Sequence, residues 1–258
     1  MFRDGKRALH LCYLPLVGAS AAASRWARVD WSTDRYHLQD GDDMATRSAS
    51  SRGAASPGRP RLVQPKRRGD TARDEILDAS AELFARHGYT GTSTRMIADA
   101  VGVRQASLYH YFKTKDDILA ALLATTVDPS LDRARNLLSA DDSPLHRLLD
   151  LARFDVTQLA EARWNLGALY LLPELGDERF AGFRAARQEL ARAYETLAAA
   201  ALDDRADTRS LLPFRLVESV IMMRSDEQRG ELGEHTVAGL VDTIVGAIEM
   251  LLERTPIR

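Results

Sequence analysis

The chain has 258 residues, of which 45% are hydrophobic and 28% are charged, and its formal net charge is −2. Its single cysteine, Cys12, excludes a disulfide within the chain and any zinc or iron–sulfur centre held by several cysteines. No apolar run reaches the roughly 18 residues that a transmembrane helix needs. The length and the apolar fraction suffice for one or two globular domains.

The near-neutral total conceals three stretches of different charge. Residues 1–43 carry six basic and six acidic side chains, residues 44–69 carry seven basic and no acidic ones, and residues 70–258 carry 22 basic and 31 acidic ones. The middle stretch is rich in Ser, Gly and Pro and cannot bury enough apolar surface to fold alone. We therefore predict a disordered basic extension over residues 1–69, either a solvated linker or an arm that binds nucleic acid.

The first 43 residues have the outline of a secretory signal, with a basic start, a weakly apolar middle and a run of small residues. His10 and Pro15 interrupt the apolar part, and Met44 offers another translation start. We expect this segment either to lie upstream of the true start or to belong to the extension, whereas a mature protein beginning near Ala22 would indicate export. Because the one cysteine lies in this segment, the rest of the chain suits the cytoplasm.

From residue 70 onward the apolar residues recur at intervals of three and four, and alternating β patterns bounded by hairpin turns are absent. The first predicted helix has an apolar face from Ile76 to Phe84 and ends at His87-Gly88. This pattern predicts an all-α fold.

Two short helices follow, joined by a tight turn that contains Gly102. Ser93 caps the first of them, and the second runs from Gln105 to Phe112 around the apolar anchor Leu108. Such a pair forms a helix-turn-helix, whose second helix enters the DNA major groove in many DNA-binding proteins. The same arrangement also occurs in α-proteins with no DNA role, so periodicity alone leaves both interpretations open.

The exposed positions of the second short helix are polar or small. Arg and Gln side chains can bind guanine and adenine edges, a small residue allows close approach, and aromatic rings can contact thymine methyl groups. Four basic residues between positions 95 and 115 outnumber the single acid, Asp99, so this face is positive although the body is acidic. We predict that Phe112 belongs to the core and that Tyr109 lies on the surface.

The stretches Ile76–Tyr89, Thr92–Ala98 and Gly102–Lys115, followed by Ile118-Leu119, resemble the tetracycline-repressor (TetR) family of bacterial regulators. The glycine stop, the Ile-Ala pair, the Gly-Val turn, Leu-Tyr-His and Lys-x-Lys all have the family's spacing. Arg104 departs from the family, in which a small or polar residue is commoner, and this affects the bases recognised rather than the fold. The resemblance implies about nine helices, a homodimer, and a C-terminal ligand pocket that controls DNA affinity.

The resemblance also implies which residues contact DNA. It implies that Ser93 and Arg95, at the start of the first of the two short helices, contact DNA. It also implies that His110 and Lys115 contact phosphates. With Arg104 included as a base-reading candidate, the predicted DNA-binding set is Ser93, Arg95, Arg104, Gln105, Ala106, Ser107, Tyr109, His110, Tyr111 and Lys115.

We assign the helix-turn-helix domain to residues 70–118 and a ligand-binding and dimerisation domain of about six helices to residues 119–258. The further helices are predicted at 117–139, 144–162, 164–172, 177–202, 208–224 and 234–253. The last two carry broad apolar stripes that an isologous four-helix interface with a second copy would cover, unless both stripes are core within one chain. These stripes are Leu211, Leu212, Phe214, Leu216, Val217, Val220 and Ile221 in one helix, and Val237, Leu240, Val241, Ile244, Val245, Ile248 and Leu251 in the other.

A ligand pocket should be mostly apolar with a few placed polar groups. Its predicted residues are Phe154, Trp164, Asn165, Leu169, Tyr170, Phe183, Tyr194 and Met222, with Met223 beside it.

The predicted function is a repressor that binds a palindromic double-stranded DNA operator as a homodimer and is released by a small hydrophobic effector. No phosphate-binding loop, His-Glu-x-x-His motif or metal-ligand spacing is present, so we predict no enzyme activity, no cofactor, no metal and no membrane partner. An all-α enzyme and a helical partner-binding module without a DNA role are the alternative interpretations.

Overall fold

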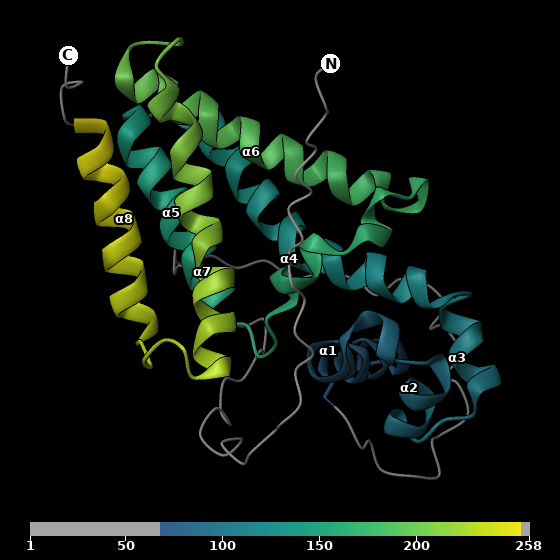
Figure 1. Cartoon of the computed structure of the whole chain (residues 1–258). Coiled ribbons are helices and arrows are strands. Elements are labelled where there is room, and N and C mark those ends of the chain that lie inside the picture. Colours follow the sequence, from purple (N-terminus) through teal and green to yellow (C-terminus); the bar gives the residue numbers. More distant parts are fainter. Residues whose placement is uncertain (1–67, 254–258) are drawn as a thin grey trace, which may run out of the picture. The chain divides into compact units, whose positions relative to one another are not determined.

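A computed structural model describes residues 68–253 of the chain. The predicted leader (1–43) and nearly all of the predicted basic extension lie outside the described residues. Within 68–253 the regular secondary structure consists of α-helices and short 3-10 helices with no strand, which confirms the all-α prediction (Figure 1). None of these helices is long and apolar enough to cross a membrane.

Three helices open the fold: α1 (Ala72–Gly91), α2 (Thr94–Val101) and α3 (Gln105–Tyr111). Thr71 and Asp74 form a reciprocal capping box at the start of α1. The backbone leaves helical geometry at Gly88 (φ 71°), where the sequence predicts the end of the first helix. Gly102 ends α2 in the left-handed region (φ 78°), a conformation that permits the sharp turn into α3.

Five longer helices follow: α4 (Lys115–Leu138), α5 (Pro144–Glu161), α6 (Ala181–Leu202), α7 (Leu212–Arg229) and α8 (Val237–Glu253). The helix predicted over 164–172 is instead the 3-10 helix η1 (Leu166–Leu171), followed by η2 (Pro173–Gly176) and η3 (Glu178–Phe180). A Cβ atom at Gly167 would lie 2.6 Å from Ile221 Cδ1, so the close approach of η1 to α7 requires glycine. Another 3-10 turn, η4 (Thr208–Leu211), precedes α7.

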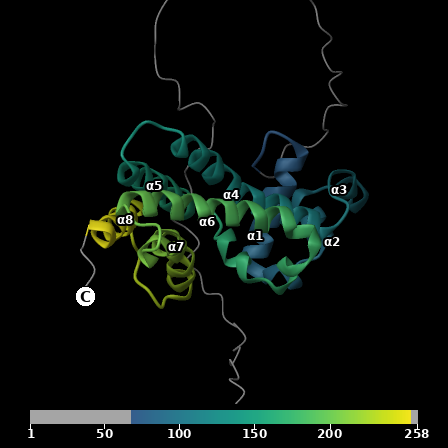
Figure 2. The same cartoon turned by 90° about the horizontal axis from the view of Figure 1, so that it is seen from above.

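Two hydrophobic clusters meet along α4. The first joins α1–α3 to the start of α4 and also contains Leu169 and Phe180 from the 3-10 segment. The second contains the rest of α4, from Val127 onward, with α5–α8. Helix α6 packs along α4 (Figures 1 and 2). The boundary that the sequence suggested near residue 118 therefore falls inside one continuous helix, and the described residues form one compact unit.

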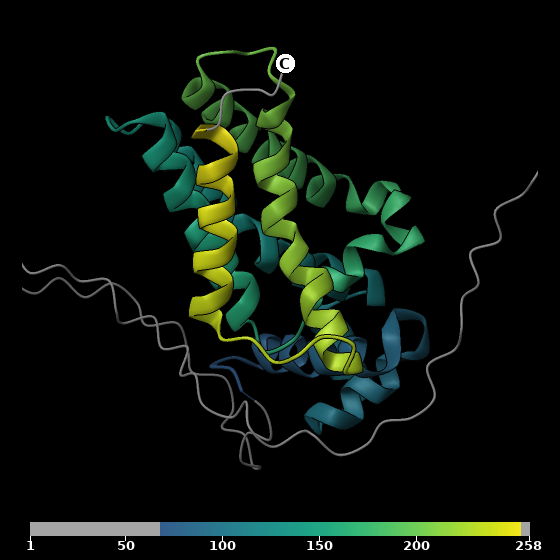
Figure 3. The same ribbon diagram turned by 60° about the vertical axis from the view of Figure 1, so that its left-hand side comes forward.

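Helices α7 and α8 lie side by side at one flank of the helical body (Figure 3). Most of the two apolar stripes is buried within the single chain, because both helices pack against α5. This finding favours the intramolecular interpretation for most stripe residues. The large apolar side chains that stay exposed in this region are Leu211, Leu212, Met222 and Met250.

Candidate nucleic-acid interface and internal cavity

Helices α2 and α3 direct their polar side chains outward because a few apolar residues hold the pair down. Leu108 and Ile97 are fully buried, and Phe112 is buried as predicted. Lys113 Nζ donates to the Tyr109 carbonyl at 3.4 Å at the end of α3. The exposed residues of this surface include nine of the ten predicted DNA-binding residues: Ser93, Arg95, Arg104, Gln105, Ala106, Ser107, Tyr109, His110 and Tyr111.

A polar cluster joins the start of α2 to α3. Gln105 Nε2 donates to Thr94 Oγ1 at 3.0 Å, and the Tyr109 hydroxyl lies 3.2 Å from both Thr94 Oγ1 and Gln105 Nε2. These contacts hold two exposed side chains in one orientation before any partner binds, which lowers the entropic cost of binding. Sequence reasoning missed Thr94, whose only signal is its place beside the capping residue Ser93.

The amino end of α2 favours an anion. Ser93 Oγ accepts a hydrogen bond from the Met96 backbone N–H at 3.2 Å, and its own hydroxyl hydrogen stays available for a phosphate. The free backbone N–H groups and the dipole of α2 add positive potential at the same end. Arg95 lies 3.9 Å from Asp99, and both side chains are largely exposed. Such a weak ion pair can exchange for a phosphate contact.

Lys115, the tenth predicted residue, is half-buried and already engaged. Its Nζ donates to the carbonyls of Tyr89 (2.8 Å) and Thr92 (2.9 Å) and lies 4.1 Å from the centre of the Tyr89 ring. Lys115 therefore ties the end of α1 to the start of α4, with at most one N–H left for a phosphate. Its contact with DNA stays a prediction.

A polar network continues from this point into the rest of the body. The Tyr89 hydroxyl and the Arg179 guanidinium both donate to Asp116 at the start of α4. Burial and the hydrogen bond to Asp116 raise the pKa of Tyr89, so the phenol keeps its proton and donates it. Because Arg179 belongs to η3, the network links the α1–α3 unit to the segment that precedes α6.

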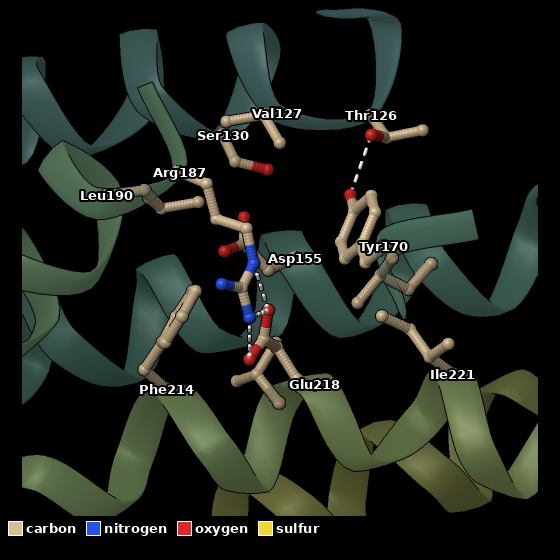
Figure 4. A pocket seen from close by; sticks show the side chains of 12 residues that line it. Thr126, Val127, Ser130, Asp155, Tyr170, Arg187, Leu190, Phe214, Glu218 and Ile221 are labelled. Atoms are coloured by element: carbon tan, nitrogen blue, oxygen red, sulfur yellow. Dashed lines mark hydrogen bonds and ion pairs between the residues drawn. The ribbon is translucent and has the colours of Figure 1, made fainter. Parts of the chain in front are cut away.

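A small cavity of about 30 Å³ lies between the central helices (Figure 4). Its walls come from α4, α5, α6, α7 and η1, and half of the lining residues are polar. It is lined by Thr126, Val127, Ser130, Asp155, Leu159, Tyr170, Arg187, Leu190, Phe214, Val217, Glu218 and Ile221.

Of the predicted pocket residues, only Tyr170 lines this cavity. The Phe183 ring packs at a tilt against the Tyr170 ring, with 5.2 Å between the ring centres, and Tyr194 is fully buried and donates to Asp155. Asn165 uses its amide to donate to the Ile221 carbonyl (2.8 Å) and to Ser225 Oγ (2.9 Å) on α7.

The other predicted pocket residues lie elsewhere because tertiary packing turns them away. The guanidinium groups of Arg86 and Arg163 lie over the Trp164 ring, at 5.5 and 4.9 Å from its centre. Leu169 belongs to the first core cluster, and Phe154 is half-buried outside the cavity lining. Met222 is 51% exposed, and Met223 packs on the second core cluster. The candidate residues for a ligand in this cavity are therefore those that line it.

An ion pair dominates one wall of the cavity. Arg187 Nε lies 2.8 Å from Glu218 Oε1 and Nη2 lies 2.7 Å from Oε2, and Figure 4 shows the guanidinium pointing at this carboxylate. Arg215 adds a further contact to Glu218 Oε2 at 2.8 Å. On the opposite side Tyr170 donates to Thr126 Oγ1 at 2.6 Å. Sequence reasoning missed Arg187 and Glu218, because charges on a helix resemble a solvated face.

Asp155 is the other acid of the cavity and is only 3% exposed. Its Oδ2 accepts a hydrogen bond from the Tyr194 hydroxyl at 2.8 Å. Burial raises the pKa of Asp155 to about 7, outweighing the hydroxyls of Ser130 and Tyr194, which favour the charged form. No sequence signal separated this aspartate from the exposed acids of the chain.

Comparison with known proteins identifies the family. Residues 76–122 match the sequence profile described as bacterial regulatory proteins of the tetR family. The crystal structure of Mycobacterium smegmatis AmtR is 52% identical, with 75% of this chain and 92% of that chain aligned and a TM-score of 0.67. The chain belongs to the TetR family. The polar surface on α2 and α3 of this TetR-family chain lies largely within the matched residues.

Two further relatives extend the comparison. The HTH-type transcriptional repressor KstR2 of Mycolicibacterium smegmatis is 36% identical over 93 residues, which are 35% of this chain and 45% of the repressor. The match therefore spans about half the length of this curated relative. AibR, solved in complex with isovaleryl coenzyme A and operator DNA, is 20% identical, with 68% of this chain and 97% of AibR aligned and a TM-score of 0.56, and shows the fold alone.

Among residues 68–253, no group of three His, Cys, Asp or Glu side chains is placed to hold a metal ion.

Proposed function

We propose that this TetR-family chain is a ligand-responsive transcriptional repressor that binds a palindromic operator as a homodimer and is released by a small effector molecule. The observation that carries the proposal is the α2–α3 surface, on which Gln105 and Tyr109 are exposed yet held in place by Thr94. Arg95 and Arg104 add exposed positive charge beside them. Gln is suited to adenine edges and Arg to guanine edges or phosphates.

The similarity to a named repressor supports the DNA-binding part of the proposal. KstR2 is an HTH-type transcriptional repressor, and its 36% identity extends over 93 residues. Since the matched stretch covers only part of KstR2, it supports the class of function and not its target genes.

A homodimer is supported by the apolar side chains that one chain leaves uncovered. Leu212 and Met222 on α7 and Met250 on α8 are between 45% and 56% exposed. A two-fold axis beside these helices would bury the three side chains of each chain against the other chain. Two recognition helices would then meet half-sites about 34 Å apart, one turn of DNA.

Helix α4 supports a route from effector to DNA. It starts next to α3, and its cavity residue Thr126 lies 11 positions after Lys115, about 16 Å along the helix axis. Pro129 lacks a backbone N–H, so α4 has one helical hydrogen bond fewer at the level of the cavity. A ligand that displaces α4 there would tilt its other end and alter the spacing of the recognition helices. A coupling of about 1–3 kcal/mol changes DNA affinity several-fold to about a hundredfold.

The DNA-binding proposal is tested by fluorescence anisotropy on the DNA that flanks the protein's own gene, at several salt concentrations. We expect binding that weakens steeply with salt, because phosphate contacts release counterions. Gln105→Ala should weaken binding by about tenfold or more, whereas Gln188→Ala, a matched change at an exposed position on α6, should not. Absent or salt-insensitive binding would contradict the proposal, as would equal effects of the two variants.

A further inference from the structure

The cavity contains one polar atom whose bonding capacity the protein leaves unused. Asp155 Oδ1 is buried and has no partner in ordinary hydrogen-bond geometry among residues 68–253, whereas Oδ2 accepts from Tyr194 and the Ser130 hydroxyl faces the carboxyl. Buried polar atoms of folded proteins are nearly always hydrogen-bonded, because an unpaired one costs about 1–3 kcal/mol. An unpaired acceptor beside a cavity therefore suits a group that enters from outside and carries a donor.

The charges around the cavity determine which kind of donor fits. Arg187 is held on Glu218 by two of its nitrogens, so its charge is matched within this pair, and Arg215, which also contacts Glu218, is largely exposed and lies outside the cavity lining. The groups that face Asp155 from the neighbouring helices are the hydroxyls of Ser130 on α4 and Tyr194 on α6. Both are neutral donors. The cavity consequently lacks one positive charge when Asp155 is ionised.

The size of the cavity limits the part of the ligand that binds there. About 30 Å³ gives room for about two water-sized groups, enough for an ammonium headgroup but not for a drug-sized molecule. Val127, Leu190 and Val217 supply apolar surface next to the carboxyl. The apolar body of even a short amine exceeds this room and would have to displace α4 from α7, which is the movement proposed above for release from DNA.

We propose that the effector is a small organic cation whose N–H group donates to Asp155 Oδ1 while its short apolar body packs against Val127, Leu190 and Val217. This inference rests on the proposed function, since it names the ligand class of the same regulator. It also revises the expectation of a purely hydrophobic effector. A hydrocarbon ligand would leave Asp155 Oδ1 without a partner and would also exclude water from it.

Isothermal titration calorimetry on the full chain tests the inference with three probes of nearly equal size. These are n-propylammonium, 1-propanol and propionate, measured at pH 8, where Asp155 is ionised in the larger fraction of molecules. We expect saturable binding of n-propylammonium and binding at least about tenfold weaker for the alcohol and the carboxylate. No saturable binding of the ammonium, or equal binding of all three probes, would overturn the inference without recourse to a variant.

Two matched variants locate the site. Asp155→Asn keeps the shape of the side chain but removes the charge, and it should weaken n-propylammonium binding by about tenfold or more. Asp128→Asn is the same change at an exposed position on α4 and should leave the affinity unaltered. Affinities that are the same in Asp155→Asn and the unchanged protein would overturn the assignment.

DNA binding, measured in parallel, separates this inference from the proposed function. If the protein without ligand does not bind the flanking DNA, the regulator proposal fails while calorimetry still tests the Asp155 site. If it binds DNA, n-propylammonium should weaken binding more than sodium chloride at equal ionic strength, because bulk salt alone screens phosphate contacts. Binding at Asp155 that leaves DNA affinity unchanged would overturn the effector role.

Discussion

The α2–α3 surface and the cavity between α4 and α7 both contain polar side chains, but these differ in their access to water. On the surface, Thr94, Gln105 and Tyr109 bind one another while water remains within reach, so each can change partner at little cost. In the cavity, Asp155 is withdrawn from water and the Arg187–Glu218 pair is partly withdrawn, so a missing partner costs more free energy there. Changes on the surface should therefore alter DNA affinity, whereas changes in the cavity should alter stability as well.

The largest expected effect comes from Leu108, a buried apolar residue beneath the α2–α3 surface. Leu108→Ala removes a fully buried side chain and should lower the free energy of unfolding by about 2–5 kcal/mol, measured by urea denaturation. Leu171→Ala is the control, since Leu171 is 80% exposed and its truncation should change stability by less than about 0.5 kcal/mol. Similar losses in both variants would show that burial does not distinguish the two positions.

The next largest effect is the pH dependence of the free energy of unfolding that Asp155 in the cavity should cause. Asp155 has a pKa near 3.8 in the unfolded chain and about 7 in the folded protein, so the folded state retains a proton over that interval. The free energy of unfolding should therefore fall as pH rises from about 4 to about 7, by on the order of 2–4 kcal/mol, and stay low above it. Asp155→Asn should lack this fall.

Urea denaturation of both proteins at pH 5 and pH 8 gives the measurement. The other titrating groups are common to the two proteins, so the difference between their pH dependences reports on residue 155. Asp128→Asn, at an exposed position on α4, should behave as the unchanged protein. Equal pH dependence with and without Asp155 would contradict the raised pKa.

A smaller effect distinguishes Lys115 from the exposed residues of the surface. Lys115→Ala should lower stability by about 1–3 kcal/mol, because the carbonyls of Tyr89 and Thr92 lose a charged donor. Tyr109→Ala should weaken DNA binding with little change in stability. Thermal unfolding and anisotropy, measured on both variants, compare the two outcomes. A Lys115→Ala protein with unchanged stability would contradict this structural role of the lysine.

The smallest effect is expected at Arg95. Its ion pair with Asp99 is exposed on both sides, so Arg95→Ala should change the free energy of unfolding by less than about 0.5 kcal/mol. If Arg95 binds a phosphate, the slope of log affinity against log salt concentration should fall by about one. A slope that stays the same would remove Arg95 from the DNA contacts.

Much of the helix-turn-helix could be predicted because its signals are local. Ser93 caps α2, Gly102 closes the turn and Leu108 anchors α3, each through contacts with near neighbours in the chain. Because Leu108 occupies the buried side of α3, the polar residues of this helix face outward. Lys115 was harder to place, because its carbonyl partners lie 26 and 23 positions earlier in the chain.

The sequence by itself determined the helical class, the caps, the turn and the outward face of α3, since these depend on helical period and on bonds within a few residues. Only the tertiary structure decided which side chains meet at the cavity. Asp155, Arg187 and Glu218 lie on three different helices, and each resembles an ordinary solvated charge until those helices pack. Burial raises the pKa of Asp155 and leaves its Oδ1 atom to accept a hydrogen bond from the proposed ligand. Burial arises only when the helices pack into the core, so the sequence alone could not reveal it.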